Sequence, residues 1–508
     1  MCRRFLGGIL LVSSLFWIGC RGKPDDHSTT VFLIDNSPTN LDPRIGVDPH
    51  SEHIDELLFD GLVARDENFR FGPGLAERWE QPDPLTSIFH LRTGVKFSDG
   101  RALTSKDVVW TLNSMRDGTV ITPKASSYAS ISRIEAPDAM TVILHLKTPD
   151  NFLLSNLSSG AMGIVPEGSG RDFWKHPVGT GSFRFVSQEI DKEVVIERNP
   201  GSWEPVTGGV ERVRFAVVPD GTTRALELRK GSADVASNSL TADVLPVLAA
   251  QTNLRVEGVG GTQVQYLAFN TVDPILKDVR VRQAIACAID RGLILRTLLA
   301  GRAKPAVSLL PEKHWAWTGD VAVYDYDPAR SGRLLEAAGY RPDAHGVRLH
   351  LAMKTSTDDG TRLLAATMQQ QLAAVGIALE IRSYESATFI QDLNRGSFQM
   401  YALRWVGGNE QPDIFTTFSV ARIPPKGPNR GRYRNARMDA LLEDASRSPD
   451  QERRRADYVL VQQILARDLP AFNMWYQDSV LVHSRRLSGV AISPSGSFGF
   501  LRTARWQP

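Results

Sequence analysis

The sequence predicts an α/β fold that is divided into more than one domain. Segments in which apolar and polar residues alternate are interleaved with segments of helical spacing. A late strand–helix–strand unit favours two parallel strands with a helix packed on them. The chain has 508 residues, and at this length we expect about three domains rather than one compact core.

Composition is typical of a globular protein. Hydrophobic residues make up 42% and charged residues 23%, which excludes a disordered, collagen-like or multi-span membrane protein. The 59 Lys and Arg residues nearly balance 57 Asp and Glu residues, and the formal net charge is +2. That balance gives no electrostatic reason to expect a nucleic-acid partner.

The start of the chain is predicted to be an export signal. Two arginines precede an apolar run that is too short to span a membrane as a helix. The following Gly-Cys pair resembles a bacterial lipobox, in which Cys20 becomes the lipidated first residue. The alternative is an ordinary cleaved signal with an incidental Cys20, because Trp17 is unusual in a lipobox. We expect residues 1–19 to be the signal, and residues 20–30 to be the lipidated cysteine and a polar tether.

Local patterns define the elements of the exported part in order. Val31 and Leu33 lie in a short buried strand that ends at an Asn-Ser-Pro turn. Thr104 and Asp107 resemble a capping box that begins a helix. Alternation predicts further strands around these residues: Phe89 and Leu91, then Val142, Leu144 and Leu146, then Val213, Phe215 and Val217.

The strand–helix–strand unit lies late in the chain. Its two strands contain Val347, Leu349 and Leu351, and then Ile377, Leu379 and Ile381, and its helix contains Leu364, Met368 and Leu372. A helical pattern before this unit holds Cys287, which we interpret as a small buried hydrophobic residue. No intramolecular disulfide is possible in a mature chain that is lipidated on Cys20, because Cys287 is then its only other cysteine.

Catalytic and metal-binding motifs are missing. The sequence contains no H-E-x-x-H, no G-x-S-x-G, no phosphate-binding G-x-x-x-x-G-K and no pair of closely spaced cysteines. His50 and His53 could share a helical face, but a metal site needs a third ligand nearby. We therefore expect no catalytic residue, no metal and no cofactor.

Several segments follow one another in a recognisable order. The most specific reads Phe-His-Leu-Arg-Thr-Gly-Val-Lys-Phe-Ser-Asp-Gly at residues 89–100. The others are Leu-Ala-Glu-Arg-Trp at 75–79, residues 103–109 and 178–183, Arg198-Asn199-Pro200 before Trp203, Phe269-Asn270-Thr271, and residues 279–285, 288–291, 327–328 and 334–340. Together they resemble family 5 of the extracellular solute-binding proteins, which includes dipeptide-, oligopeptide- and nickel-binding proteins of ABC importers. The resemblance covers nearly all of the mature chain.

The resemblance implies a periplasmic-binding-protein-like fold of type II (cluster C), with two hinged lobes and an extra inserted lobe. Lobe I would comprise residues 31–44, 176–269 and 479–508, the inserted lobe residues 45–175, and lobe II residues 270–478. Such a protein closes over its ligand by a hinge motion and performs no chemistry.

The implied function is that of a lipid-anchored substrate-binding protein of an ABC importer. It would capture peptides or a similar small polar solute and deliver it to the permease and ATPase complex. We expect a monomer in the periplasm or at the cell surface, attached to a bacterial membrane by lipid on Cys20, with no nucleic-acid partner.

Three loops are expected to face each other between the lobes and to bind the ligand. The first contains Ser37, Pro38 and Thr39; the second contains Gln263, Gln265 and Tyr266 and leads to Asn270; the third contains Arg404, Trp405, Gly407, Gly408, Asn409 and Glu410.

The third loop departs from the pattern of peptide-binding relatives, which carry Trp-x-Ala-Asp and pair that aspartate with the peptide's free amine. Gly408 stands at the place of the aspartate. A buried ammonium without a carboxylate loses a charge-assisted hydrogen bond, so this departure argues against recognition of a free amine in the usual way. Glu410 could replace the aspartate, Trp405 could stack on the solute or pack in the core, and Arg404 could pair with an anionic group or be solvated.

Other functions stay open on the sequence alone. The protein could bind a non-peptide solute such as a nickel chelate, an opine or a sugar. It could also be a receptor or chaperone, since a fold does not determine a function. A hydrolase would need a nucleophile and a base in the cleft, and no such pair can be identified from the sequence.

Overall fold

The computed structural model describes residues 29–66, 70–158, 162–204, 207–405 and 412–507. The predicted signal and Cys20 lie outside these residues. No helix among the described residues is long and apolar enough to cross a membrane.

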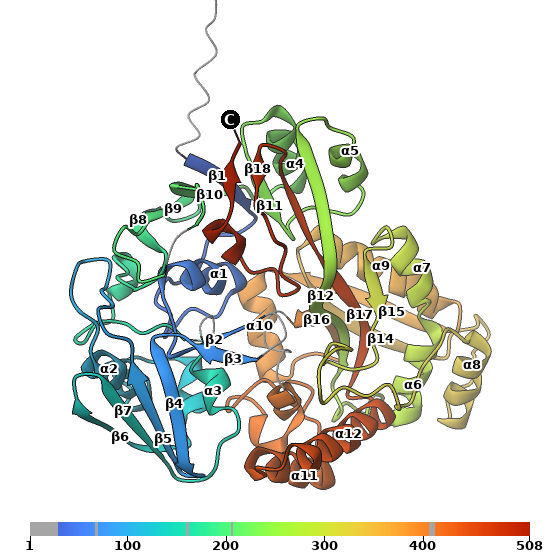
Figure 1. The fold of residues 1–508 in the computed structure, drawn as a ribbon. Helices are drawn as coiled ribbons and strands as arrows, with labels where there is room; N and C mark the ends of the chain where they lie inside the picture. Colours follow the sequence, from blue (N-terminus) through green and yellow to red (C-terminus); the bar gives the residue numbers. More distant parts are fainter. Residues whose placement is uncertain (1–28, 67–69, 159–161, 205–206, 406–411, 508) are drawn as a thin grey trace, which may run out of the picture.

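One large sheet runs through the molecule (Figure 1). Its strands lie in the order β15 (Ile377–Tyr384), β14 (Leu349–Ser356), β16 (Met400–Trp405), β12 (Leu254–Phe269), β17 (Ala471–Ser484), β11 (Val235–Ser237), β1 (Thr29–Ile34), β10 (Arg212–Val217), β9 (Glu193–Arg198) and β8 (Phe183–Glu189), and β13 (Ala303–Pro305) pairs with β17. The long strands β12 and β17 pair with each other from Leu254 opposite Ser484 to Ala268 opposite Ala471. At one end β17 pairs with β11, and at the other β12 pairs with β16.

Strand β1, in the region expected to form lobe I, confirms the first predicted strand. Phe32 and Ile34 face one hydrophobic cluster and Leu33 faces another, so β1 is buried on both sides. The helices around it are α4 (Gly221–Lys230), α5 (Leu245–Ala249) and α1 (Pro49–Leu58), and α1 lies here although residues 45–175 are expected from the sequence to form the inserted lobe. The carboxyl-terminal segment adds β18 (Leu487–Ser488), the 3₁₀ turn η6 (Gly499–Arg502) and β19 (Arg505–Trp506). Ile54 and Leu57 of α1 pack in the same cluster as Phe32.

The inserted lobe contains a four-stranded antiparallel sheet with its own hydrophobic core. The sheet order is β4 (Ala76–Asp83), β5 (Thr86–Leu91), β7 (Thr141–Leu146) and β6 (Ile131–Asp138). The remaining elements are β2 (Val63–Arg65), β3 (Phe71–Pro73), α2 (Ser105–Arg116), α3 (Leu153–Asn156), η1 (Pro123–Tyr128) and η2 (Phe173–Lys175). The predicted capping box is confirmed, because Thr104 N donates to Asp107 Oδ2 at 2.7 Å at the start of α2.

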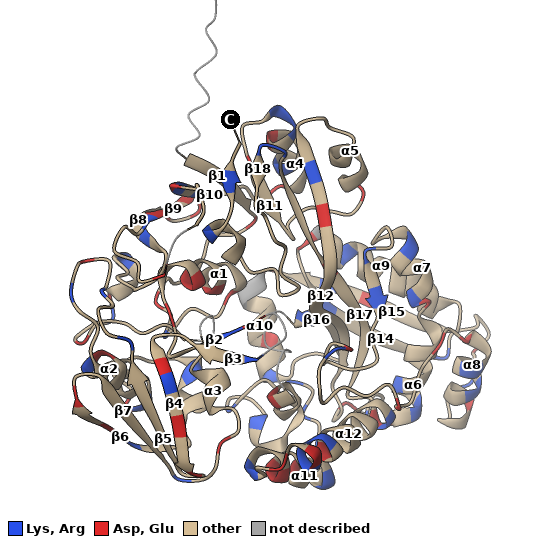
Figure 2. Cartoon of the chain, viewed as in Figure 1, with Lys and Arg blue, Asp and Glu red and all other residues tan. Residues whose placement is uncertain are grey.

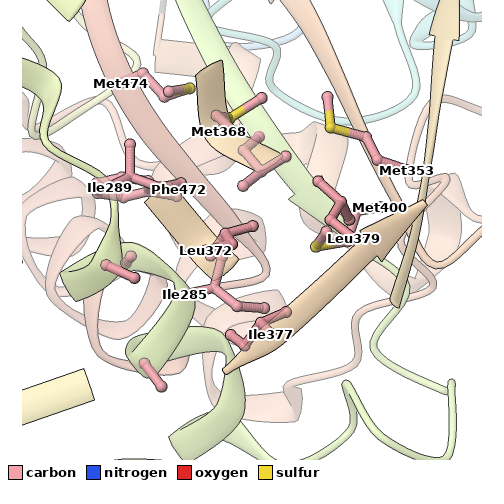
Figure 3. Packing of buried hydrophobic residues seen from close by; sticks show 14 of the residues in the cluster. Ile285, Ile289, Met353, Met368, Leu372, Ile377, Leu379, Met400, Phe472 and Met474 are labelled. Carbon is pink, nitrogen blue, oxygen red and sulfur yellow. The ribbon is translucent and has the colours of Figure 1, made fainter. Parts of the chain in front are cut away.

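Lobe II contains the predicted strand–helix–strand unit. Strands β14 and β15 are parallel, with Leu349 opposite Ile377, and α9 (Asp359–Ala373) connects them. Figure 3 shows Met368 and Leu372 of α9 directed towards side chains of these strands and of α6 (Val279–Ala288). Cys287 is fully buried in α6, as the sequence predicts.

Further helices complete lobe II and bring it next to the inserted lobe in Figure 1. They are α7 (Arg291–Thr297), α8 (Pro328–Ala337), α10 (Ser386–Arg395), α11 (Ala436–Arg447), α12 (Gln451–Asp468), η4 (Pro412–Phe418) and η5 (Val420–Arg422). Charged residues of both signs are distributed over both lobes and the inserted lobe (Figure 2).

Candidate ligand-binding cleft

The pairing of β12 with β17 is interrupted where the two strands cross between the lobes. Val259 lies opposite Ser479 and Gln263 lies opposite Gln477, so three residues of β12 face one residue of β17. A Cβ atom on Gly261 would lie 2.1 Å from the carbonyl oxygen of Gln477. The close approach of the strands therefore requires glycine at this position.

The second predicted loop lies directly after this interruption. Gln263 is only 8% exposed, and Gln265 Nε2 donates to Leu403 O at 3.0 Å. Tyr266 lies on the other side of β12 and stacks on Trp405, with ring centroids 5.5 Å apart and planes inclined by 17°. Burial raises the pKa of Tyr266 well above its ordinary value, so its phenol stays protonated.

The third predicted loop begins at the end of β16. The exposed Arg404 donates from Nη1 to Gln477 Oε1 at 3.2 Å, and no described carboxylate forms an ion pair with it. Trp405 is half-buried, and its Nε1 has no hydrogen-bond acceptor among the described residues. Gly407, Gly408, Asn409 and Glu410 lie outside the described residues.

The first predicted loop is bonded within lobe I. Ser37 Oγ accepts from Asp191 N at 3.1 Å, and Pro38 O accepts from Gln188 Nε2 at 3.4 Å. Thr39 Oγ1 donates to Asp48 Oδ2 at 2.5 Å. These bonds hold the loop between α1 and the β8–β9 hairpin.

Asn270 connects two segments of lobe II. Its Nδ2 donates to Phe398 O at 2.9 Å and to Gly396 O at 3.3 Å, and its Oδ1 accepts from Val272 N. These bonds occupy the amide and give Asn270 a positioning role at the end of β12.

The inserted lobe also contacts lobe II directly, away from the crossing of β12 and β17. Asn151 Nδ2 donates to the carbonyl oxygens of Ala445, Ser446 and Ser448, at 3.2, 2.9 and 2.8 Å. Phe152 packs against the hydrophobic cluster of lobe II that contains Phe415. We call Asn151, Phe152 and the carbonyl groups that Asn151 binds the clasp.

Asp413 of η4 titrates between the lobes. Burial raises its pKa to about 6, Arg422 and Arg65 oppose that rise, and Asp150 of the inserted lobe adds to it. Burial, and to a lesser extent Arg65, lowers the pKa of His314 in lobe II to about 4, so this imidazole is neutral at pH 7. The positive charge of Arg65, on β2, thus lowers the pKa values of two side chains in lobe II, Asp413 and His314.

A cavity that the sequence did not predict lies beside the cleft. It has a volume of about 440 Å³ and is lined by Glu56, Asp60, Arg65, Trp203, Glu204 and Arg502 and by the segment 493–499. Trp203 carried a sequence signal, since it follows the Arg-Asn-Pro motif. The other residues come from distant parts of the chain, and no local pattern connects them. Nowhere in the described chain do three or more His, Cys, Asp or Glu side chains form a group that could hold a metal ion.

The sequence matches one protein family over most of its length. The profile of "Bacterial extracellular solute-binding proteins, family 5 Middle" covers residues 70–421. The chain is 26% identical over 506 residues to "Di/tripeptide-binding protein 1" of Pseudomonas aeruginosa UCBPP-PA14, covering 93% of each protein. It is also 26% identical over 482 residues to "Glutathione-binding protein GsiB" of Salmonella paratyphi A, covering 92% of this chain and 93% of that protein.

Solved structures share the fold. DppA of Helicobacter pylori, in complex with the peptide STSA, superposes with a TM-score of 0.84 at 25% identity, covering 94% of this chain and 98% of that one. NikZ of Campylobacter jejuni, in complex with Ni(L-His), superposes with a TM-score of 0.84 at 22% identity, covering 94% of this chain and 99% of that one. The similarity to NikZ shows the fold alone.

Proposed function

The chain belongs to family 5 of the bacterial extracellular solute-binding proteins, and on that premise we propose that it captures peptides for an ABC importer. Members of the family are solute-binding proteins of ABC transporters and are not enzymes. The proposal is supported by the match, along nearly the whole chain, to relatives named for dipeptides, tripeptides and glutathione. Two lobes joined by crossing strands provide the geometry for closing over such a ligand.

Arg404 is proposed to hold the anionic end of the peptide. Its guanidinium lies where the two lobes meet, is oriented by Gln477, and forms no ion pair within the described residues. A guanidinium and a carboxylate form a strong, often bidentate, charge-assisted pair. Gln263, Gln265 and the segment 407–410 are proposed to surround the same ligand, whereas Trp405 packs against Tyr266 on the other side of β12.

We also propose that the protein is exported and attached to a membrane by a lipid anchor. The apolar start of the sequence supports export, and Cys20 after Gly19 supports a lipid anchor. The protein would work as a monomer in the periplasm, where it passes its peptide to a permease and ATPase complex.

Calorimetric titration of the purified protein with alanine tripeptides tests both the ligand class and the role of Arg404. We expect Ala-Ala-Ala with a free carboxylate to bind about tenfold more tightly than its C-terminal amide, because the amide loses a bond to a charged group. Arg404→Gln should remove this preference. Arg382→Gln, which changes an exposed arginine of β15 paired with Glu380, is the control.

Two results would contradict the proposal. If neither these peptides nor a mixed library of di- to pentapeptides bind, and native mass spectrometry finds a copurified non-peptide mass, the solute is not a peptide. If Arg404→Gln keeps the tenfold preference, the carboxylate lies elsewhere.

A further inference from the structure

The cavity beside the cleft has walls from lobe I and from the inserted lobe. Glu56 belongs to α1, Asp60 follows that helix, Arg65 belongs to β2, and Arg502 lies in the carboxyl-terminal segment. Its volume of about 440 Å³ falls in the range of about 300–1,000 Å³ that is usual for small-molecule pockets. The space is therefore large enough for an amino-acid side chain.

Carboxylates outnumber guanidiniums in this cavity. Glu56, Asp60, Asp66 and Glu204 line it together with Arg65 and Arg502. Glu56 keeps a lowered pKa despite its burial, through hydrogen bonding to His53 and Ser497 and the charges of His53 and Arg502. Asp66 is already paired with Arg70 at 2.8 Å, and Glu56 faces His53 at 3.8 Å, so the lining acids that remain for a ligand are Asp60 and Glu204.

Asp60 is the most buried of these carboxylates. It is 4% exposed, and its Oδ2 accepts from Thr180 Oγ1 at 2.8 Å and from Trp203 Nε1 at 2.9 Å. Its Oδ1 accepts no hydrogen bond, and no cation pairs with it, anywhere in the described chain. A cation that enters the cavity would find this Oδ1 free to accept a charge-assisted hydrogen bond.

Glu204 lines the same cavity as Asp60. Burial raises its pKa, Arg502 and Arg92 oppose the rise, and the charge of Asp60 adds to it. Arg502 Nη1 lies 3.8 Å from Glu204 Oε2, a contact too long for a hydrogen bond. The carboxylate of Glu204 therefore keeps the capacity to accept a hydrogen bond from a ligand.

The cavity adjoins the place where the ligand is proposed to bind. Its wall residue Pro494 accepts, through its carbonyl oxygen, a hydrogen bond of 3.1 Å from Thr262 N at the interruption of β12. On its other side lies β2, which Figure 1 places in the centre of the molecule, between the inserted lobe and lobe II.

We propose that this cavity binds the cationic group of the transported solute, an ammonium or guanidinium such as the side chain of a lysine or arginine residue in a peptide. The inference rests on the proposed function and extends it to the choice among peptides. With the carboxylate of the peptide at Arg404 in lobe II, the cation would lie on the opposite side of the cleft, against Asp60 and Glu204. Closure would then bring each charged end of the ligand into contact with a protein group of opposite charge.

Two peptides that differ only in charge test the inference. Ala-Lys-Ala and Ala-(Nε-acetyl-Lys)-Ala share a backbone and side-chain length, and only the first carries an ammonium. Calorimetry on the purified full-length protein should show about tenfold tighter binding of the first, because it adds a hydrogen bond between charged groups. Glu204→Gln, which keeps the side-chain shape, should reduce the ratio below about threefold. Glu77→Gln, an exposed acid of β4 in the inserted lobe, should leave the ratio unchanged.

Each result decides the inference. Equal binding of the two peptides by the unmodified protein overturns it and leaves the proposed function intact, and so does a tenfold ratio that persists in Glu204→Gln. If neither peptide binds, peptide capture itself fails for this pair, and the cavity is then tested with agmatine alone. A rise in Tm with agmatine that Glu204→Gln abolishes supports the cation site, whereas the absence of a rise in the unmodified protein overturns it.

Discussion

Lobe II meets the rest of the molecule in two regions of different construction. At the crossing, β12 and β17 are continuous chains with paired backbones, and glycine allows them to approach closely. At the clasp, an amide and an aromatic ring from the inserted lobe lie against lobe II. The crossing therefore sets where the lobes can turn, whereas the clasp influences how strongly the closed arrangement is held.

The energy of the clasp is modest. The last carbonyl groups of a helix have no partners within the helix, and Asn151 binds such groups at the end of α11. Each hydrogen bond contributes about 0.5–1.5 kcal/mol to the folded arrangement. Such a contact can bias an equilibrium between open and closed forms, while a ligand that binds both lobes shifts it further.

The largest effect is expected at the crossing. Gly261→Ala places a Cβ atom 2.1 Å from the carbonyl oxygen of Gln477, so a backbone must move. We expect the free energy of unfolding to fall by about 2–4 kcal/mol, measured by urea denaturation. Gly260→Ala is the matched control, because a Cβ atom there meets nothing within 4 Å. Equal losses in both variants would show that the strands do not need this close approach.

A smaller effect is expected at the clasp. Asn151→Ala removes the donor for three carbonyl groups and should weaken the closed arrangement by about 1–3 kcal/mol. Small-angle scattering of the ligand-free protein should then give a larger radius of gyration, and peptide affinity should fall. Asn253→Ala, at an exposed position of lobe I, should change neither quantity. An unchanged radius and affinity in Asn151→Ala would remove the clasp from the account of closure.

The features that could be predicted from the sequence differ from those of the clasp in one physical respect. The capping box of Thr104 and Asp107 and the β14–α9–β15 unit depend on residues close together in the chain, so periodicity and turn chemistry identified them. Asn151 binds carbonyl groups 294, 295 and 297 residues away, and no local pattern records such a contact.

The candidate site was predictable to a similar extent. Resemblance to a family directed attention to the loops at the crossing, and the structure places Gln265 opposite Arg404 there, with Trp405 on the other face of the sheet. The cavity at Asp60 was missed, because its walls come together only in the folded chain. The interpretation of Gly408 and Glu410 stays a prediction, since both lie outside the described residues.

Closure is also expected to depend on pH, through the side chain of Asp413. Asp413 has a raised pKa of about 6, so its neutral form is favoured in the closed arrangement. Its contribution is greatest below its unperturbed pKa of 3.8 and is lost as the pH rises through about 6. We expect closure to be weaker at pH 7.5 than at pH 5 in the unmodified protein, and Asp413→Asn to reduce that difference. Scattering at both pH values measures it, and an equal pH dependence in both proteins would exclude Asp413 as the titrating group.

The smallest effect is expected for Arg422→Ala. Arg422 Nη1 donates to Ser126 Oγ of the inserted lobe at 3.2 Å, in an exposed contact that crosses between the lobes. Exposed polar contacts of long side chains contribute little, and we expect closure at pH 5 to change by less than about 0.5 kcal/mol. Arg422 also lowers the pKa of Asp413, so its removal should move the midpoint of the pH dependence upwards. A large loss of closure at pH 5 would mean that the exposed contact between Arg422 and Ser126, rather than Asn151 and Phe152, holds the inserted lobe against lobe II.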